Sequence, residues 1–214
     1  MDEEISIIDT NTRNEKIKNF FINNKKKIIL TAITVFIILI AYLLYGTHID
    51  KKKIKLADQY NLTIINFNSN NKENTVKELI DIINENNKTY SPLALYFLID
   101  NSLIKDRDQI NTMFDSILKK TKLKLEIKNL IIYKKGLYNS DNSSENELIN
   151  ILNPIINSKS MWKSHALHLI AEYFYSRNEK NKAKEFFQQI ISLENSSPEI
   201  KLKAIKRIKR DLGE

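Results

Sequence analysis

The sequence predicts an all-α protein, in which one N-terminal transmembrane helix is followed by about four helical hairpins and a C-terminal capping helix. Three observations support this prediction. Residues 28–45 form a run of 18 uncharged residues. Beyond that run, apolar residues recur with the spacing of one helix face, in units of about 34 residues. Glycine and proline number only three each among 214 residues, which disfavours a sheet-rich fold with many tight turns.

The apolar run is expected to be a retained membrane anchor over residues 28–46, preceded by a short tail over residues 1–27. A helix of this length spans ~27 Å, close to the ~30 Å hydrocarbon core of a bilayer. The lysines at both ends can reach the headgroups. A cleaved signal peptide is the alternative, but its apolar core usually ends within about 15 residues and a small-x-small cleavage pattern follows it. No such pattern follows residue 45.

The orientation of the anchor is predicted from the basic residues on its two sides. Six Lys and Arg residues lie within about 20 positions before the run, and four lie within about the same distance after it. The positive-inside rule then places the N-terminal tail in the cytoplasm and residues 47–214 in the periplasm. Because the difference is only two residues, the opposite orientation, with the domain in the cytoplasm, stays open on charge alone.

Residues 47–214 are predicted to form a domain of helical hairpins. One apolar pattern with the spacing i, i+3, i+4, i+7 occurs four times, beginning at Val76, Ile110, Leu148 and Ala183. These starting positions differ by 34, 38 and 35 residues. An apolar stretch of helical length precedes each of them, over residues 55–67, 92–103, 123–138 and 161–175. Such pairs, repeated at this period, are typical of helical-hairpin repeats.

Two serine–proline pairs and the last apolar stretch mark helix boundaries. Ser91 and Ser197 are predicted to cap helices whose first residues are Pro92 and Pro198. The stretch over residues 198–212 has no predicted partner after it. Its apolar residues form one stripe opposite a basic face, which suits a helix that covers the last hairpin.

The fourth hairpin resembles a tetratricopeptide repeat. The motif places bulky, small and aromatic residues at fixed offsets, which are occupied here by Leu167, Ile170, Ala171, Phe174, Ala183, Phe187 and Ile190. The third hairpin keeps a small residue at one offset, Gly136, whereas the first two have Ile64 and Leu98 there. The resemblance implies a right-handed superhelix of about four degenerate repeats. Small residues would let paired helices approach closely, and the first helix of each hairpin would line a binding groove.

A wider resemblance covers nearly the whole chain. A short charged tail, one span and a degenerate tetratricopeptide domain are similar to the bacterial inner-membrane proteins that act as ancillary subunits of the SecYEG translocon, the YfgM-like family. Alphaproteobacterial members are similar in detail around residues 152–155 (LNPI) and around Trp162, Lys163 and Ala166. The resemblance implies a periplasmic domain that associates with the translocon, periplasmic chaperones and exported chains. It carries over no catalytic residue.

The fourth hairpin also holds the residues best suited to a metal. His165, His168 and Glu172 have helical spacing and could supply three zinc ligands. Because the H-E-x-x-H arrangement is absent and the stretch matches a repeat helix, we expect exposed or interfacial histidines and no metal or cofactor. Trp162 is expected to pack between hairpins, with contact to a ligand as the alternative. Pro154 is expected to kink or end a helix.

An enzyme is not predicted. The sequence contains no phosphate-binding loop, no G-x-S-x-G elbow and no cysteine. The formal charge is +8, but the lysines are interleaved with Asp and Glu, and the dense basic run at residues 201–210 is interpreted as a solvated helix face, not a nucleic-acid site. The predicted function is that of a non-enzymatic, membrane-tethered adaptor that binds proteins or peptides. The alternatives are a structural scaffold for envelope assembly or cell division, and a membrane-bound assembly factor in the cytoplasm.

Overall fold

The computed structural model describes the backbone of residues 2–213 and the side chains of residues 13–46, 51–68 and 70–213. This part of the chain contains ten α-helices, one 3-10 helix and no strand. The all-α prediction is therefore confirmed. By its internal contacts the chain divides into two compact units, Met1–Asp58 and Gln59–Glu214.

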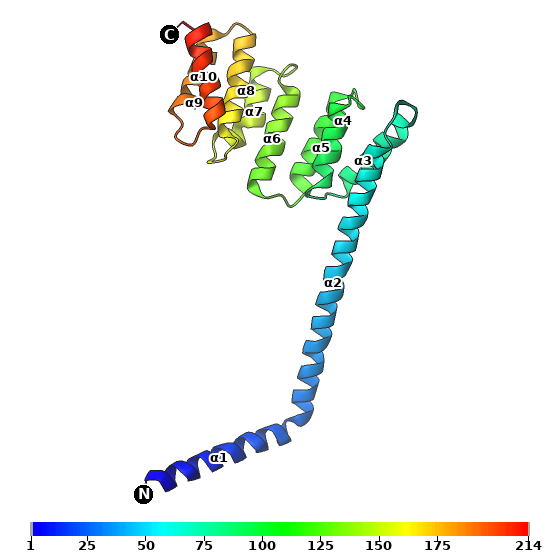
Figure 1. Ribbon diagram of the computed structural model, residues 1–214, viewed down its shortest axis with the longest axis vertical. Helices are drawn as coiled ribbons and strands as arrows, with labels where there is room; N and C mark the ends of the chain where they lie inside the picture. Colours follow the sequence, from blue (N-terminus) through cyan, green and yellow to red (C-terminus); the bar gives the residue numbers. More distant parts are fainter. Residues whose placement is uncertain (1, 214) are drawn as a thin grey trace. The chain divides into compact units, whose positions relative to one another are not determined.

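The N-terminal unit consists of α1 (Asp2–Asn23) and most of α2 (Lys25–Ile65), which Figure 1 shows in blue to cyan. Its apolar part has a mean hydropathy of 2.7 over an 18-residue window, and none of that window is buried. The hydroxyls of Thr31 and Thr34 each donate to the carbonyl oxygen four residues earlier, at 2.9 Å, so these polar groups are satisfied inside the helix. By length and composition, α2 is able to cross a membrane.

The anchor and the first helix of the first hairpin form one continuous helix. The predicted helix over residues 55–67 is not a separate element, because α2 runs without a break for 41 residues to Ile65. The lysines after the apolar run do not interrupt it, since lysine has a high helix propensity and no proline or glycine occurs between residues 47 and 65. A helix of this length extends for ~60 Å, about twice the thickness of the hydrocarbon core.

All the other predicted helices of the hairpins are present in the second unit. They are α3 (Lys72–Asn84), α4 (Tyr90–Asp100), α5 (Arg107–Lys120), α6 (Leu125–Asn139), α7 (Glu145–Ile156), α8 (Lys163–Ser176), α9 (Lys180–Ser192) and α10 (Pro198–Asp211), with a 3-10 turn at Ser69–Asn71 before α3. Side-chain caps fix two of the starts. Asp106 accepts from two backbone N–H groups of α5, and Ser144 and Glu147 form a reciprocal capping box at α7.

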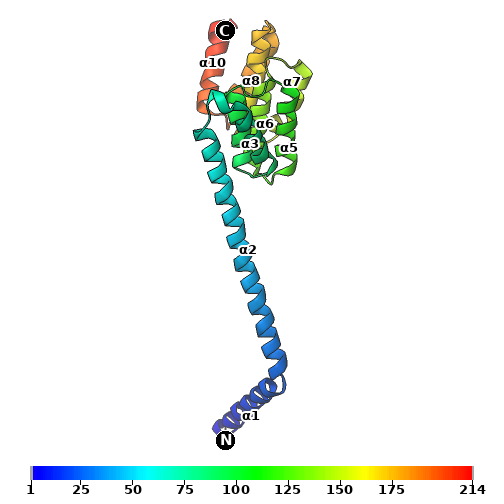
Figure 2. The same cartoon turned by 90° about the vertical axis from the view of Figure 1, so that its right-hand side faces the viewer.

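The even-numbered helices from α4 to α10 are called the first helices, and α3, α5, α7 and α9 the second helices. From α3 to α10, each helix packs on the next one in the sequence, and α8 also packs on α6 and on α10. Among the described residues, the second helices α5 and α7 have no extensive contact with each other, and neither do α7 and α9. In Figure 2, α5 and α7 lie together on one side of α6 and α8. The first helices from α6 to α10 therefore form a closely packed layer.

One apolar core runs through the C-terminal hairpins. It contains the residues predicted to pack the repeats, namely Leu167, Ile170, Ala171, Phe174, Ala183, Phe187 and Ile190, none of which is more than 1% exposed. Gly136 on α6 is buried as well. A Cβ atom built on Gly136 would lie 2.5 Å from Cδ2 of Leu152, so a glycine here permits the close approach of α6 and α7.

Neither of the two predicted serine caps forms a capping hydrogen bond. α10 begins at Pro198, as predicted, but the Ser197 side chain makes no capping hydrogen bond. The prediction for Ser91 is wrong, because α4 begins earlier, at Tyr90. The Ser91 hydroxyl donates instead to the carbonyl oxygen of Ile82 on α3, at 2.9 Å, and the residue is fully buried. The serine thus joins two helices and does not cap one.

Pro154 lies in the last turn of α7, which ends two residues later at Ile156. Its ring is exposed, so the position tolerates a residue that cannot donate a backbone hydrogen bond. The proline therefore ends the helix and leaves the adjoining core intact.

Candidate protein-binding surface

A groove separates α4 from α6. The first helix α6 packs on α8, and α8 packs on α10. In the described part of the chain, α4 does not pack on α6 in the same way. The space between them has a volume of about 370 Å³. Its walls are formed by Lys88, Thr89, Pro92, Leu93, Tyr96, Leu123, Lys124, Ile127, Leu130 and Ile131. A volume of this size is within the range of sites that bind small ligands or a few side chains of a peptide.

The walls are apolar because α4 and α6 each present apolar residues on two faces. On α4, Leu95 and Leu98 are fully buried in the core, whereas Leu93 faces the groove and is 39% exposed. On α6, the apolar run of residues 130–133 continues around the helix, so that it cannot all face one core. Ile127, at the outer end of the groove, is 42% exposed.

Tyr96 is the main polar group in the walls. Its hydroxyl is buried and has no hydrogen-bond partner among the described residues. This burial raises the pKa of Tyr96 to about 12. The Nζ atom of Lys134 lies 5.6 Å from the centre of its ring. The hydroxyl therefore stays neutral over the ordinary pH range, and it is closed off from solvent.

The rim of the groove is basic. Within residues 119–128, five lysines are exposed, namely Lys119, Lys120, Lys122, Lys124 and Lys128. None of them forms an ion pair within the described part of the chain. The one acidic residue of this segment, Glu126, accepts a hydrogen bond from the Ser160 hydroxyl at 2.7 Å. The segment thus presents unpaired positive charge beside exposed apolar side chains.

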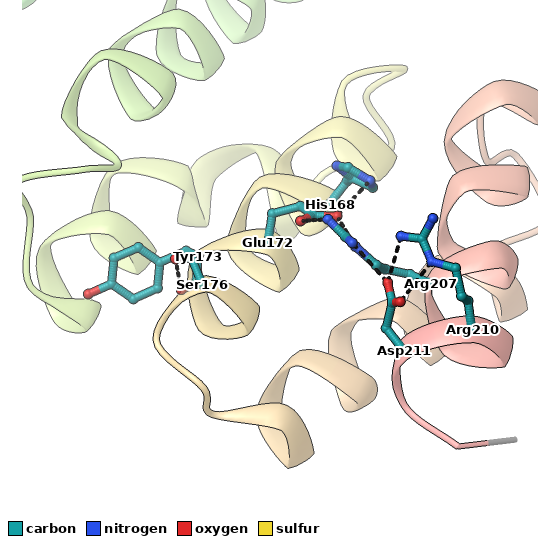
Figure 3. A network of polar contacts seen from close by, with 7 residues as sticks. All are labelled: His168, Glu172, Tyr173, Ser176, Arg207, Arg210 and Asp211. Atoms are coloured by element: carbon teal, nitrogen blue, oxygen red, sulfur yellow. Dashed lines mark hydrogen bonds and ion pairs between the residues drawn. The ribbon is translucent and has the colours of Figure 1, made fainter.

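The layer of α8 and α10 has a different chemistry (Figure 3). The guanidinium of Arg207 on α10 donates to both carboxylate oxygens of Glu172 on α8, at 3.0 and 2.7 Å. It also donates to Asp211 at 2.8 Å and lies over the ring of Tyr175. Arg210 makes two further hydrogen bonds to Asp211, which hold the pKa of that carboxyl well below its ordinary value. Of the six basic residues of α10, Lys203, Arg207 and Arg210 thus form ion pairs with carboxylates.

The two histidines lie beside this network. His168 approaches Glu172 at 3.7 Å, and the ring of His165 packs against Trp162 and Tyr133. Burial lowers the pKa of both histidines below the ordinary value. No group of three or more His, Asp or Glu residues suited to a metal occurs among the described residues. The geometry thus gives these side chains a packing role, and His165, His168 and Glu172 are not assembled as a ligand set.

Trp162 lies between the third and fourth hairpins. Its ring stacks on Tyr133 of α6 with the centroids 5.6 Å apart, immediately before the start of α8. This position corresponds to the predicted packing role. The residues expected to pack the repeats also lie in the core and do not line the groove, whereas Pro92, predicted at a helix start, is part of its wall.

The resemblance implied a groove lined by first helices, but neither its place between α4 and α6 nor the role of the basic segment was predicted. The signal was present in residues 119–128, where five lysines accompany one glutamate. A second signal was the apolar run at residues 130–133, which gives α6 little amphipathicity. Such a helix has to cover more than one apolar surface, and here the second surface is the groove.

The chain was compared with protein-family models, with curated proteins and with solved structures, and none of the three comparisons finds a match. The resemblance to the translocon-associated family therefore remains an expectation.

Proposed function

We propose that this protein is a non-enzymatic, membrane-tethered adaptor that binds proteins or peptides through its helical hairpins, which we take to form a right-handed superhelix of the tetratricopeptide type. The observation that carries this proposal is the groove between α4 and α6. It is lined mainly by apolar side chains, and it lies where two successive first helices do not pack extensively on each other. Grooves between helices of repeat domains are a recurrent mode of peptide recognition.

The proposed site of action is the SecYEG translocon in the bacterial inner membrane. In this proposal the N-terminal tail is cytoplasmic, α2 crosses the membrane once and the hairpins lie in the periplasm. The partners would be translocon subunits, periplasmic chaperones and exported chains. Two observations support it, the apolar part of α2 and the larger number of basic residues before it. Tethering would raise the local concentration of the groove where chains leave the membrane.

Site-specific photo-crosslinking tests the binding function. A photoreactive phenylalanine derivative replaces Ile127 in the groove of the full-length protein, and a second variant carries it at Leu202, an equally exposed apolar position on α10. We expect crosslinks to other proteins from position 127 and few from position 202. Equal crosslinking from both positions, or none from position 127, would contradict the groove as a binding site. The identity of the crosslinked proteins distinguishes an adaptor at the translocon from an envelope or division scaffold.

A reporter fused after Glu214 tests the orientation. Alkaline phosphatase is active only in the periplasm, whereas ordinary green fluorescent protein fluoresces in the cytoplasm. We expect an active phosphatase fusion and a dark fluorescent fusion. The reverse result would place the hairpins in the cytoplasm and exclude periplasmic chaperones as partners.

A further inference from the structure

We infer that the groove between α4 and α6 binds an acidic amphipathic segment of a partner protein, whose apolar side chains enter the groove and whose carboxylates meet the lysines at its rim. This inference rests on the proposed function and narrows it to one class of ligand. The contacts, the charge and the exposed surface of the groove each support it.

The contacts support an inserted element. From α6 to α10, successive first helices pack on each other, and a continuous buried core joins them. Between α4 and α6 no helix of the described residues fills the space, although Leu93 and Ile127 face it. A segment that inserts apolar side chains there would remove this surface from water, as an additional helix of the layer would do.

The charge supports an acidic ligand. The walls of the groove include Lys88 and Lys124 but no Asp or Glu. The neighbouring lysines of residues 119–128 form no ion pair in the described part of the chain, whereas Arg207, Arg210 and Lys203 on α10 are all paired with carboxylates. The charged side chains in the walls of the groove are therefore all positive, which complements an acidic ligand. Complementary charge at a rim accelerates association and excludes ligands of the wrong sign.

The exposed surface supports a peptide over a flat lipid surface. The apolar side chains lie in a recess of about 370 Å³, which the planar surface of a bilayer does not fill. Single side chains of a peptide can enter such a recess, as they do in other helical grooves. An anionic membrane would satisfy the lysines but leave the recess unfilled.

The test measures binding of labelled peptides to the full-length protein in detergent by fluorescence anisotropy. One probe is an amphipathic peptide of leucine, alanine and glutamate, and its matched control has lysine in place of glutamate. We expect the acidic peptide to bind at least about tenfold more tightly. We expect Lys124→Glu to weaken its binding about fivefold and Ile127→Gln about tenfold. The exposed residues Lys206 and Leu202 on α10 supply the matched controls Lys206→Glu and Leu202→Gln, which should leave binding unchanged.

The other outcomes separate the alternatives. Equal binding of both peptides would overturn the inferred ligand class. Displacement of the acidic peptide by phosphatidylglycerol vesicles, but not by phosphatidylcholine vesicles, would assign the rim to an anionic lipid surface and also overturn it. If neither peptide binds while position 127 still crosslinks to proteins, this inference fails and the proposed function stands. Circular dichroism of Ile127→Gln shows whether it is folded, and Leu93→Gln on the opposite wall provides a second test.

Discussion

The fourth hairpin with α10 and the region from α4 to α6 are both built from paired helices but differ in packing. Between α8 and α9, the small residues Ala171 and Ala183 are fully buried, and the rings of Phe174 and Phe186 stack at 5.6 Å. Between α4 and α6 an open groove remains. The spacing of apolar residues thus determines how each helix packs on the next one in the sequence. It does not determine whether successive first helices contact each other.

Side chains outside the repeat pattern account for this difference. At the C-terminal end, Arg207 joins α10 to Glu172 of α8 and closes the layer. In the region from α4 to α6, Leu98 occupies the offset that holds a small residue in the fourth hairpin, and lysines surround the start of α6. The closed region is built for stability, and the open region leaves apolar surface available to a partner.

The largest expected effect tests the closed region. Phe187→Ala removes a fully buried ring from the core of α8 to α10 and should lower the free energy of unfolding by about 3–5 kcal/mol. Urea unfolding followed by far-UV circular dichroism measures the change. Leu202→Ala, on the exposed face of α10, is the control and should change stability by less than about 0.5 kcal/mol. A loss below about 1 kcal/mol for Phe187→Ala would mean that this core is not tightly packed.

The next test concerns the contact between α6 and α7. Leu152→Ala should destabilise the protein by about 2–5 kcal/mol, because Leu152 is fully buried. Gly136→Ala gains about 1 kcal/mol of helix propensity but forces a Cβ atom against Leu152, so a net loss of about 1 kcal/mol is expected. In the double variant the added methyl group partly fills the cavity, and its loss should be smaller than the sum of the two. Strict additivity would show that Gly136 is not there for close approach.

The sequence was sufficient to predict the helices because each signal was local. The apolar spacing located α5, α7 and α9, and Pro198 located the start of α10. The local pattern was misleading at Ser91, because a serine before a proline is typical of a helix cap. The buried carbonyl oxygen of Ile82 competes for that hydroxyl, and this partner lies nine residues away on another helix. Only the fold shows which of the two the hydroxyl reaches.

The groove was harder to predict because it exists only where α4 and α6 do not pack on each other. Leu93 and Ile127 are ordinary apolar residues of helices, and nothing in their spacing shows that α4 and α6 stay apart. The basic segment at residues 119–128 was visible in the sequence, but only the fold shows that its Lys124 lines the groove, and that Arg207 and Arg210 of the denser basic run are paired with carboxylates. The distinction between paired and unpaired charge is a property of the fold.

A smaller effect is expected at a polar contact inside the region from α4 to α6. Asn111 on α5 and Asn139 on α6 exchange two hydrogen bonds, at 3.0 and 2.8 Å, and Asn139 is only 2% exposed. Asn139→Ala should cost about 1–2 kcal/mol, because it leaves a partly buried amide without its partner. Asn111→Ala should cost a similar amount, and the double variant should cost little more than either. Additive losses in urea unfolding would indicate that the two amides act independently.

The smallest expected effect is a pH dependence confined to the closed region. Burial lowers the pKa of His165 and His168 in the folded protein, and for His168 the nearby Lys203 and Arg207 act in the same direction while Glu172 opposes them. Above the unfolded pKa of about 6.5 both states are neutral. As the pH falls through that value, the unfolded chain binds more protons than the folded one, so stability decreases.

The matched variant for this effect is His165→Gln/His168→Gln. Between pH 7 and about 5.5, the wild-type protein should lose more unfolding free energy than the double variant does. This window lies above the range in which ordinary carboxyl groups titrate, at about 4, so the difference isolates the two histidines. Binding of the acidic peptide should change equally with pH in both proteins, because the groove contains no histidine. If the wild type gains stability on acidification relative to the variant, the carboxylate of Glu172 outweighs burial, and the histidines belong to the charged network of α8 and α10.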